Sequence, residues 1–254
     1  EVVWENTPRA NPEPISNLSL KHDFNFLAVS QISPRKNFNN MVKWFVEEFI
    51  DQDVGLVVKT NLASNSIMDW EHLYARVKDL LKTYPERKCS VYLLHGDLTS
   101  GQMTGLYQND KIKGMINIAH GEGFGLPMFE AAREGLPITT IGWSGQLDFL
   151  QHEGKEYFNE VDYSLSPIQA EAVWKGVLES DSMWAFADQG SYKMALRKAF
   201  KNHDDLKKQA EELKLINEEK FSDEALFERF CKEIYDPSPE ELEWMQNLSE
   251  IEIL

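Results

Sequence analysis

The sequence is poor in several features that would each indicate a particular class of protein. It has only two cysteines in 254 residues, too few for a disulfide framework or a four-cysteine zinc site. No window approaches 18 consecutive apolar residues, so no membrane span is expected. Cations are also scarce, because 26 Lys and Arg stand against 42 Asp and Glu. The net charge of −16 would repel phosphate backbones, and we expect no nucleic-acid partner.

The two cysteines, Cys89 and Cys231, both lie inside apolar stretches. They predict two buried thiols in a reducing compartment, and therefore a cytoplasmic protein, either free or peripheral to a membrane. No His, Asp and Glu residues cluster at metal-ligand spacing, so no metal is expected. No serine or cysteine lies in a nucleophile-elbow motif.

The sequence does contain a regular alternation of short apolar runs with amphipathic segments. It predicts strands at 24–30, 54–60, 89–95, 114–120 and 136–141, and helices at 37–50, 68–84, 100–108 and 127–134. Strands that are apolar throughout and separated by helices indicate a parallel sheet covered on both faces. With right-handed crossovers this gives an α/β, Rossmann-like doubly wound parallel sheet.

The two ends of the chain depart from this pattern. Residues 1–20 are rich in proline, asparagine and serine and predict a lead-in or linker. After about residue 166 we expect almost pure helix, over 167–178, 192–200, 203–219, 222–234 and 239–248. The predicted organisation is a lead-in at 1–20, a Rossmann-like domain with C-terminal helices at 21–235, and an acidic helical tail at 236–254.

The most informative segment is His120–Pro137, which reads HGEGFGLPMFEAAREGLP. It follows an expected strand, contains three glycines, and enters a helix with Pro127 in its first turn, where proline is tolerated. The glycines let the backbone approach a ligand, and N–H groups at a helix start attract phosphate. Glu122 lies in the loop and Glu130 lies in the helix, about 7 Å along its axis. The two carboxylates could bracket a ligand and accept hydrogen bonds from paired hydroxyl groups.

Several polar side chains are expected at the same edge of the sheet. Lys36 stands at a predicted helix start, where a cation opposes the helix dipole, and this favours an anion bound nearby. Lys59 ends a strand at the edge where ligands bind, and either lines a cleft or extends its ammonium group into solvent. His95 and His120 could each contact a sugar hydroxyl or be structural histidines. Trp143 lies in a loop at this edge.

The arrangement E-G-F-G-L-P-x-x-E from Glu122 to Glu130 resembles the E-x7-E motif of retaining, nucleotide-sugar-dependent glycosyltransferases with the GT-B fold, of the family-four type. The resemblance runs over about 24–234. Residues 26–37 are similar to the family's V-G-R-x-x-x-x-K-N start, and 182–184 and 195–200 to the helical end of its C-terminal domain. Full enzymes of that family have two Rossmann-like domains. Because one strand–helix series precedes the motif, the resemblance implies the C-terminal, donor-binding half of a GT-B fold, without the N-terminal domain that usually contacts the acceptor.

Carried over position by position, the resemblance implies two catalytic groups. Lys36 would face the donor's diphosphate and Glu122 would face the donor sugar. A fixed ammonium group stabilises a departing nucleoside diphosphate without a metal. Glu130 would bind the ribose hydroxyls, and the segment 95–98 would border the base. The remaining candidates for donor binding are Arg35, Lys59, His95, Gly96, Asp97, Gly123, Phe124, Gly125, Leu126 and Ser144.

The sequence departs from the family pattern at two positions. The family's partner arginine falls at Gln31, so either Arg35 replaces it or the charge clamp is weaker. Ser144 stands in place of the first glycine of a Gly-Gly pair that Ser144 and Gly145 match.

The predicted function is therefore donor binding in a hexosyltransferase-type enzyme that moves a sugar from a nucleoside diphosphate to a carbohydrate, lipid or protein acceptor. No cofactor is expected. The alternative, which Gln31 favours, is a non-catalytic nucleotide-sugar-binding or protein-interaction module of the same fold. A nicotinamide dehydrogenase is disfavoured because 30–36, after the first strand, contains no glycine.

Overall fold

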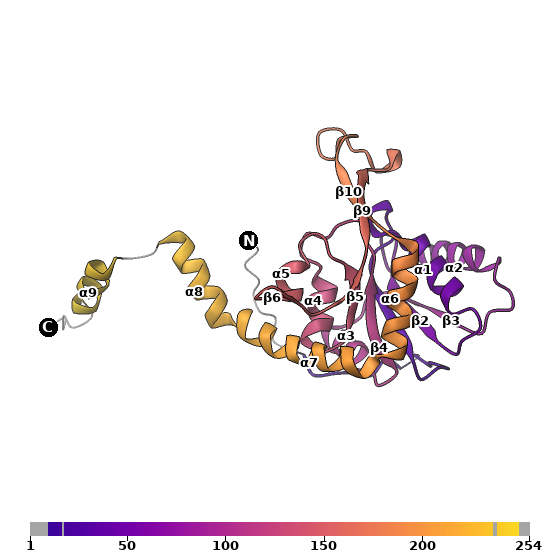
Figure 1. Cartoon of the computed structure of the whole chain (residues 1–254), viewed down its shortest axis with the longest axis horizontal. Helices are drawn as coiled ribbons and strands as arrows, with labels where there is room; N and C mark the ends of the chain where they lie inside the picture. Colours follow the sequence, from indigo (N-terminus) through magenta and orange to yellow (C-terminus); the bar gives the residue numbers. More distant parts are fainter. Residues whose placement is uncertain (1–9, 17, 236–237, 249–254) are drawn as a thin grey trace. The chain divides into compact units, whose positions relative to one another are not determined.

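The computed structural model describes residues 10–16, 18–235 and 238–248. The described residues fall into two compact units, a larger one up to residue 216 and a smaller one from residue 217 onward. The described strands all lie in the larger unit (Figure 1). Parts of the predicted lead-in (1–9 and 17) and of the predicted tail (236–237 and 249–254) lie outside the described residues.

A parallel sheet of six strands forms the centre of the larger unit, with the order β3-β2-β1-β4-β5-β8. Every pairing between these strands is parallel. The strands are β1 (Asn25–Val29), β2 (Gly55–Thr60), β3 (Ser90–His95), β4 (Ile112–Asn117), β5 (Ile138–Ile141) and β8 (Asn159–Val161). The strand order reverses between β1 and β4, which makes a topological switch point at their carboxyl ends. The predicted Rossmann-like α/β fold is confirmed.

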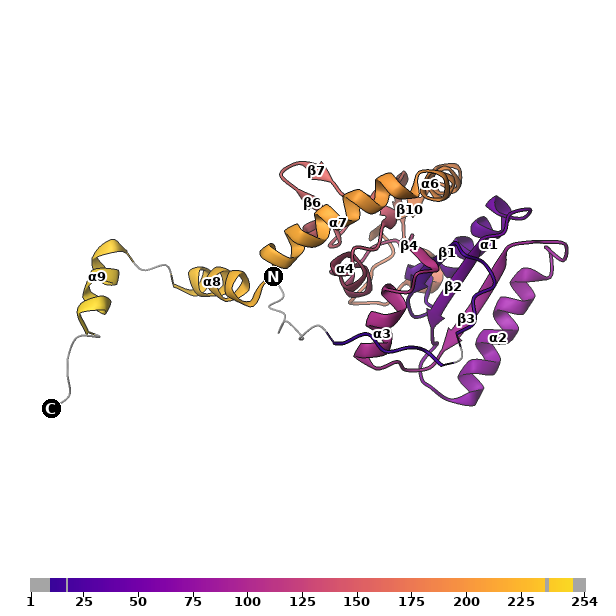
Figure 2. The same cartoon turned by 90° about the horizontal axis from the view of Figure 1, so that it is seen from below.

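Helices cover both faces of this sheet (Figure 2). One layer contains α1, which contacts both α2 and α6, whereas α3 and α4 contact each other in the other layer. These helices are α1 (Phe38–Glu48), α2 (Ile67–Leu81), α3 (Ser100–Tyr107), α4 (Leu126–Arg133) and α6 (Gln189–Lys201), and the four-residue α5 (Leu147–Leu150) follows β5. Fully buried aromatic rings, among them Phe26, Phe45 and Phe49, fill the space between α1 and the sheet. Burial of apolar rings on this scale is the main term that stabilises the fold.

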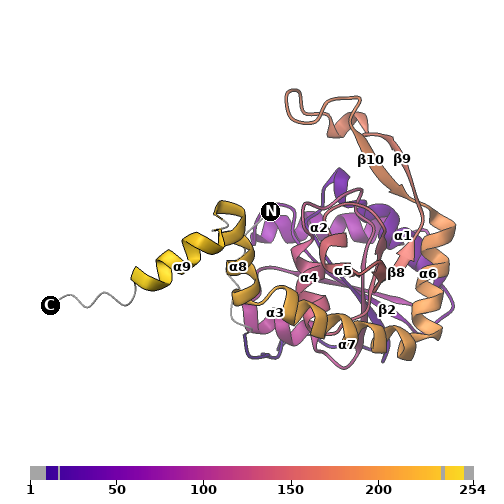
Figure 3. The same cartoon turned by 60° about the vertical axis from the view of Figure 1, so that its left-hand side comes forward.

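Two predictions for the segment after β5 are wrong. The sheet has a sixth strand, β8, where the sequence predicts five. The predicted helix at 167–178 is not formed, because β9 (Tyr163–Pro167) pairs antiparallel with β10 (Met183–Ala187), and 182–184 belongs to this β structure rather than to a helix. Between the strands lie a short 3₁₀ helix, η2 (Ala170–Ala172), and a bridge between Trp174 and Leu178. The hairpin projects beyond the sheet (Figure 3).

A local breaker and tertiary packing explain the missing helix. Pro167 is the first residue of the predicted helix, where proline is tolerated, but Gly176 takes a φ of +84°, which a right-handed helix cannot accommodate. In β10, Trp184 packs its ring on His120 at 5.5 Å between centroids. The sequence pattern cannot reveal that contact, because the partner residue lies 64 positions away.

Three helices follow: α7 (His203–Lys220), α8 (Asp223–Ile234) and α9 (Pro239–Leu248), close to the predicted bounds. A short antiparallel pair, β6 (Gln151–His152) with β7 (Lys155–Glu156), completes the elements. Cys89 is buried as predicted, but Cys231 is exposed, because no side chain of α8 is buried in the described part of the chain. None of the helices within the described ranges combines the length and apolar character needed to cross a bilayer.

Candidate functional site

The loops that follow β1, β4 and β5 meet at the switch point of the sheet. The backbone N–H of His120 donates to the carbonyl of Arg35 at 2.8 Å, which joins the loop after β4 to the loop after β1. The backbone N–H of Gly145 donates to the carbonyl of Glu122 at 3.0 Å, which joins it to the loop after β5. The candidates Arg35, Lys36, Glu122 and Ser144 are therefore brought together at the carboxyl edge of the sheet, where the sequence predicts ligand-binding side chains.

The centre of this region is an ion cluster on Glu122, whose side chain is only 7 % exposed. The Lys36 Nζ lies 2.5 Å from Oε1 and 2.7 Å from Oε2 of Glu122. Arg35 Nη1 donates to Oε2 at 3.0 Å and also to the carbonyl of Gly121, and Asn117 Nδ2 donates to Oε1 at 3.0 Å. Each carboxylate oxygen thus accepts two hydrogen bonds, which fills the capacity of the group.

The electrostatics follow from these contacts. Burial by itself would raise the pKa of Glu122, but the charge of Lys36 and the hydrogen bonds from Lys36, Asn117 and Arg35 outweigh it and lower the pKa. Glu122 is therefore ionised at neutral pH and cannot act as a general acid. Its position suits a group that holds two cations in place.

This shift predicts a specific pH dependence for Glu122→Gln. Because the folded-state pKa lies below the ordinary value of 4.5, the carboxylate contributes stability above about pH 4.5 that is lost as pH falls through the lowered pKa. Urea unfolding of both proteins between pH 3 and 7 should show a stability difference that is largest near neutrality and shrinks on acidification. Glu130 titrates in both proteins, so its own shift cancels. A difference that is constant with pH would contradict the prediction.

Lys36 owes its position to an unusual backbone. It ends the short 3₁₀ helix η1 (Pro34–Lys36), and Asn37 then takes a left-handed conformation with a φ of 51° before α1 begins. Asparagine tolerates this conformation better than most residues, and its Nδ2 donates to the carbonyl of Ile118 at 3.3 Å. The sequence predicts an anion beside Lys36, and in the structure the carboxylate of Glu122 occupies that position. An ammonium group has three hydrogens, so one remains for a ligand.

The glycine loop then leads into α4. Gly125 takes a φ of +87° at the N-cap position, and no side chain caps the helix, which begins at Leu126. Gly123 is open, since a Cβ added there would meet nothing within 4 Å. Ser144, with a φ of 82°, closes the loop from the other side by donating its hydroxyl to the carbonyl of Glu122 at 2.6 Å. Phe124 packs its ring on Phe129 and Phe149.

His120 fastens the β9–β10 hairpin to this loop. Its Nδ1 lies 2.9 Å from the carbonyl of Ala185, which can only accept, so Nδ1 carries the proton. The backbone N–H of Ala185 returns a bond to the carbonyl of His120 at 3.1 Å. Burial lowers the pKa of His120, so the ring is neutral. These contacts support a structural role for His120 rather than a contact to a sugar hydroxyl.

Glu130 lies apart from the ion cluster. Tyr107 on α3 donates its hydroxyl to Oε2 of Glu130 at 2.8 Å, and no described contact joins Glu130 to Lys36 or Glu122. Burial raises the pKa of Glu130, and the hydrogen bond from Tyr107 and the charge of Arg133 offset this only in part. Its other oxygen, Oε1, has no contact in the described part of the chain that would prevent it from binding a ligand hydroxyl.

The candidates on β2 and β3 form a third group. His95 Nε2 lies 3.0 Å from Oδ2 of Asp69, whose pKa falls because hydrogen bonds from His95 and backbone N–H groups outweigh the effect of burial. Asn65 donates a hydrogen bond to Asp97. Gly96, which lies between His95 and Asp97 in the chain, takes a φ of +101°. Lys59 is half-buried at the end of β2, and this burial lowers the pKa of its ammonium group despite the charge of Asp97.

Sequence reasoning does not single out four side chains that shape the site: Asn37, Asn117, Asp69 and Tyr107. Asn117 has a signal in hindsight, because it is the one polar side chain in the apolar run 114–119. A buried polar group in such a run needs a partner, and the partner is Glu122. Asp69 and Tyr107 lie on the helices α2 and α3, where nothing in the spacing separates them from ordinary helix residues. No cluster of three metal-ligating side chains occurs among the described residues.

No family model and no curated protein sequence matches this chain. Solved structures do match its fold. The crystal structure of HepE from Anabaena in complex with UDP and glucose has a TM-score of 0.57 and 12% identity, covering 85% of this chain and 49% of that chain. A sucrose-phosphate synthase from Thermosynechococcus elongatus has a TM-score of 0.57 and 17% identity, covering 87% and 48%. An E. coli trehalose-6-phosphate structure bound with UDP-2-fluoro glucose has a TM-score of 0.59 and 10% identity, covering 87% and 46%.

The chain thus spans about half the length of the structures it matches. At identities this low the likeness establishes the fold and leaves function to the site itself. The chain has the Rossmann-like fold of one half of a GT-B glycosyltransferase.

Proposed function

We propose that this chain binds a nucleoside-diphosphate sugar as the donor-binding part of a retaining glycosyltransferase that transfers the sugar to an acceptor hydroxyl. The observation that carries the proposal is the pair of cations, Arg35 and Lys36, held by one buried carboxylate beside a helix start without a side-chain cap. Fixed cations and a helix start are the two features that bind phosphate without a metal. The resemblance of the glycine loop to the E-x7-E motif supports the same ligand.

In this proposal Lys36 stabilises the negative charge that develops on the departing diphosphate. A preorganised cation acts on the transition state because it needs no rearrangement when the charge appears. Glu122 sets the position of Lys36 through two hydrogen bonds. To accept a bond from a sugar hydroxyl as well, Glu122 would have to release one of its four donors. Arg35 supplies the second cation and so replaces the family's arginine, whose position is occupied by Gln31 in this chain.

The other candidates line the rest of the donor in this proposal. The backbone of Gly123, Gly125 and Leu126 contacts the diphosphate, and Glu130 binds the ribose hydroxyls. Residues 95–97 and Lys59 border the base, since they follow β3 and end β2 at the same edge of the sheet. Catalysis is then mainly positioning and charge stabilisation.

A non-catalytic nucleotide-sugar-binding or protein-interaction module remains the second candidate. Two observations favour it: Gln31 stands at the position of the family's arginine, and the carboxylate of Glu122 is saturated by protein donors. A protein-interaction module differs from the first candidate in whether a nucleoside diphosphate binds at all, whereas a non-catalytic nucleotide-sugar-binding module differs only in whether the sugar is transferred.

Calorimetric titration of the full chain with UDP, GDP and ADP tests the proposal, followed by the same titration of Glu130→Gln with the nucleotide that binds best. The variant should bind about tenfold more weakly, because it loses charge-assisted bonds to the ribose. The 2′,3′-dideoxy form of that nucleotide should bind both proteins equally. Glu71→Gln, at an exposed position on α2, is the matched control. No binding of any nucleotide, or equal affinities of Glu130→Gln and the wild type for the ribose form, would favour the protein-interaction module.

A further inference from the structure

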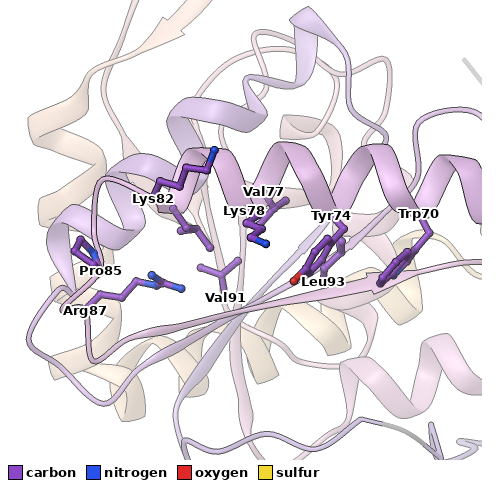
Figure 4. Close-up of a pocket in the computed structure, with 10 residues that line it drawn as sticks. Trp70, Tyr74, Val77, Lys78, Lys82, Pro85, Arg87, Val91 and Leu93 are labelled. Atoms are coloured by element: carbon purple, nitrogen blue, oxygen red, sulfur yellow. The ribbon is translucent and has the colours of Figure 1, made fainter.

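A second concave surface lies between α2 and the edge strand β3, on the larger unit (Figure 4). Its volume is about 580 Å³, which is within the range of specific binding sites in proteins. The lining residues are Trp70, Tyr74, Val77, Lys78, Leu81, Lys82, Pro85, Arg87, Val91 and Leu93. We call this surface the α2–β3 groove. None of its lining residues belongs to the candidate donor site.

Large apolar side chains form one end of the groove and its floor. Trp70 and Tyr74 stack with their ring centroids 5.2 Å apart and their planes at 10°, yet they remain 42% and 48% exposed. Val91 and Leu93 of β3 face the same space (Figure 4). Exposed aromatic rings next to an apolar floor are typical of surfaces that become buried on binding.

The charged side chains of the groove all carry the same sign. They are Lys78, Lys82 and Arg87, in a chain whose net charge is −16. Lys82 pairs with Asp79 at 2.7 Å, whereas Lys78 pairs with no carboxylate in the described part of the chain. The Nε of Arg87 is buried and has no hydrogen-bond partner among the described residues. A buried donor of this kind is costly unless an acceptor reaches it, so the groove favours an anionic occupant.

The groove also borders an open edge of the sheet. β3 pairs with β2 and has no strand on its other side within the described ranges. Each of its six residues is partly exposed. The edge therefore presents unpaired backbone N–H and C=O groups along about 20 Å, at 3.3 Å per residue. An extended peptide can satisfy these groups, which a mononucleotide or a sugar cannot do along such a length.

We propose that the α2–β3 groove binds an extended acidic peptide, which adds a strand to the free edge of β3. The side chains on the peptide face that points to α2 are both apolar and acidic: the apolar ones pack against Trp70, Tyr74 and the floor, and the carboxylates face Lys78 and Arg87. Main-chain hydrogen bonds give affinity in this binding mode, while the pockets for alternate side chains give specificity. The occupant is a separate acidic peptide, because the three cations that line the groove complement its carboxylates locally, despite the net charge of −16.

The test uses the full chain and a blocked decapeptide with threonine at every second position and glutamate in turn with valine or phenylalanine at the others, so that one face of the strand carries both acidic and apolar side chains. We expect saturable binding by calorimetry, and slower hydrogen exchange at the amides of Val91 and Leu93 when the peptide is bound. The counterpart peptide with lysine in place of glutamate should not bind. Lys78→Glu should weaken binding about tenfold, because it replaces attraction by repulsion. Lys78 is exposed and has no carboxylate partner among the described residues, and its Nζ lies 5.7 Å from the centre of the exposed Tyr74 ring, so this change should have little effect on folding.

Two controls make the result decisive. Lys175→Glu reverses a charge at an exposed position on the β9–β10 hairpin and should leave peptide binding unchanged. Polyglutamate lacks apolar side chains and should bind at least tenfold more weakly than the decapeptide. The proposal is overturned by absence of binding, by exchange at β3 that does not slow, or by polyglutamate that binds equally well. Self-association of the chain that Lys78→Glu abolishes would identify a second copy as the occupant and would also overturn it.

Discussion

Replacing Lys36 with methionine is expected to lower the free energy of unfolding by about 3 kcal/mol, because it strands a buried carboxylate. Lys36 and Glu122 are 15% and 7% exposed, so solvent screens their interaction little. Arg35 and Asn117 remain as donors, but Arg35 is 39% exposed and its interaction is screened more strongly. The expected loss therefore lies at the lower end of the range for a broken buried pair. Urea unfolding at neutral pH measures it.

The double variant Lys36→Met with Glu122→Gln is the control for this prediction. It removes both charges while it keeps an acceptor for Asn117. If the cost of Lys36→Met comes from the uncompensated carboxylate, the double variant should be more stable than the sum of the single changes predicts. A strictly additive result, or a single variant as stable as the wild type, would show that Glu122 does not depend on Lys36.

The second large effect is expected at Gly145. A Cβ at this position would lie 1.8 Å from the carbonyl oxygen of Gly123 and 3.0 Å from that of Glu122, and both are backbone atoms. Gly145→Ala must therefore push two loops apart and break the hydrogen bond from its own N–H to Glu122. We expect a loss of about 3 kcal/mol in unfolding free energy, together with a loss of nucleotide binding of at least tenfold.

Gly123→Ala provides the matched comparison from the facing loop. A Cβ there meets nothing within 4 Å, and the residue is exposed. Its unfolding free energy should stay within about 1 kcal/mol of the wild type, which is the ordinary cost or gain of such a change. If the two alanine variants had equal stability, the close packing of the loops after β4 and β5 would be contradicted.

The sequence predicts the α/β part of the fold correctly because the spacing of apolar residues along a strand or a helix is a local property of the sequence. The strands from 25 to 141 and the helices between them lie within a few residues of their predicted bounds. The hairpin was missed because its determinants are not local: Trp184 is held by the His120 ring, and Ala185 by the His120 backbone and side chain. Strand β8 was missed because three residues are too few to show a period.

For the candidate site, the sequence placed the residues but not their partners. The predicted strands place Lys36 and Glu122 at the same edge of the sheet, because both residues follow the carboxyl ends of parallel strands. The sequence does not predict that the two side chains form an ion pair, nor that Glu130 turns to Tyr107 on a neighbouring helix. Side-chain partners depend on distances across the sheet and between helices, and composition and spacing carry little information about them.

A crystal structure of the chain with UDP bound tests whether Lys36, Glu130 and the glycine loop form one donor site. We expect one nucleotide with its diphosphate against Lys36 Nζ and the backbone of Gly123 to Leu126, and with its ribose hydroxyls on Glu130. A nucleotide bound elsewhere on the chain, with Lys36 and Glu122 still paired and untouched, would show that these residues do not bind the donor.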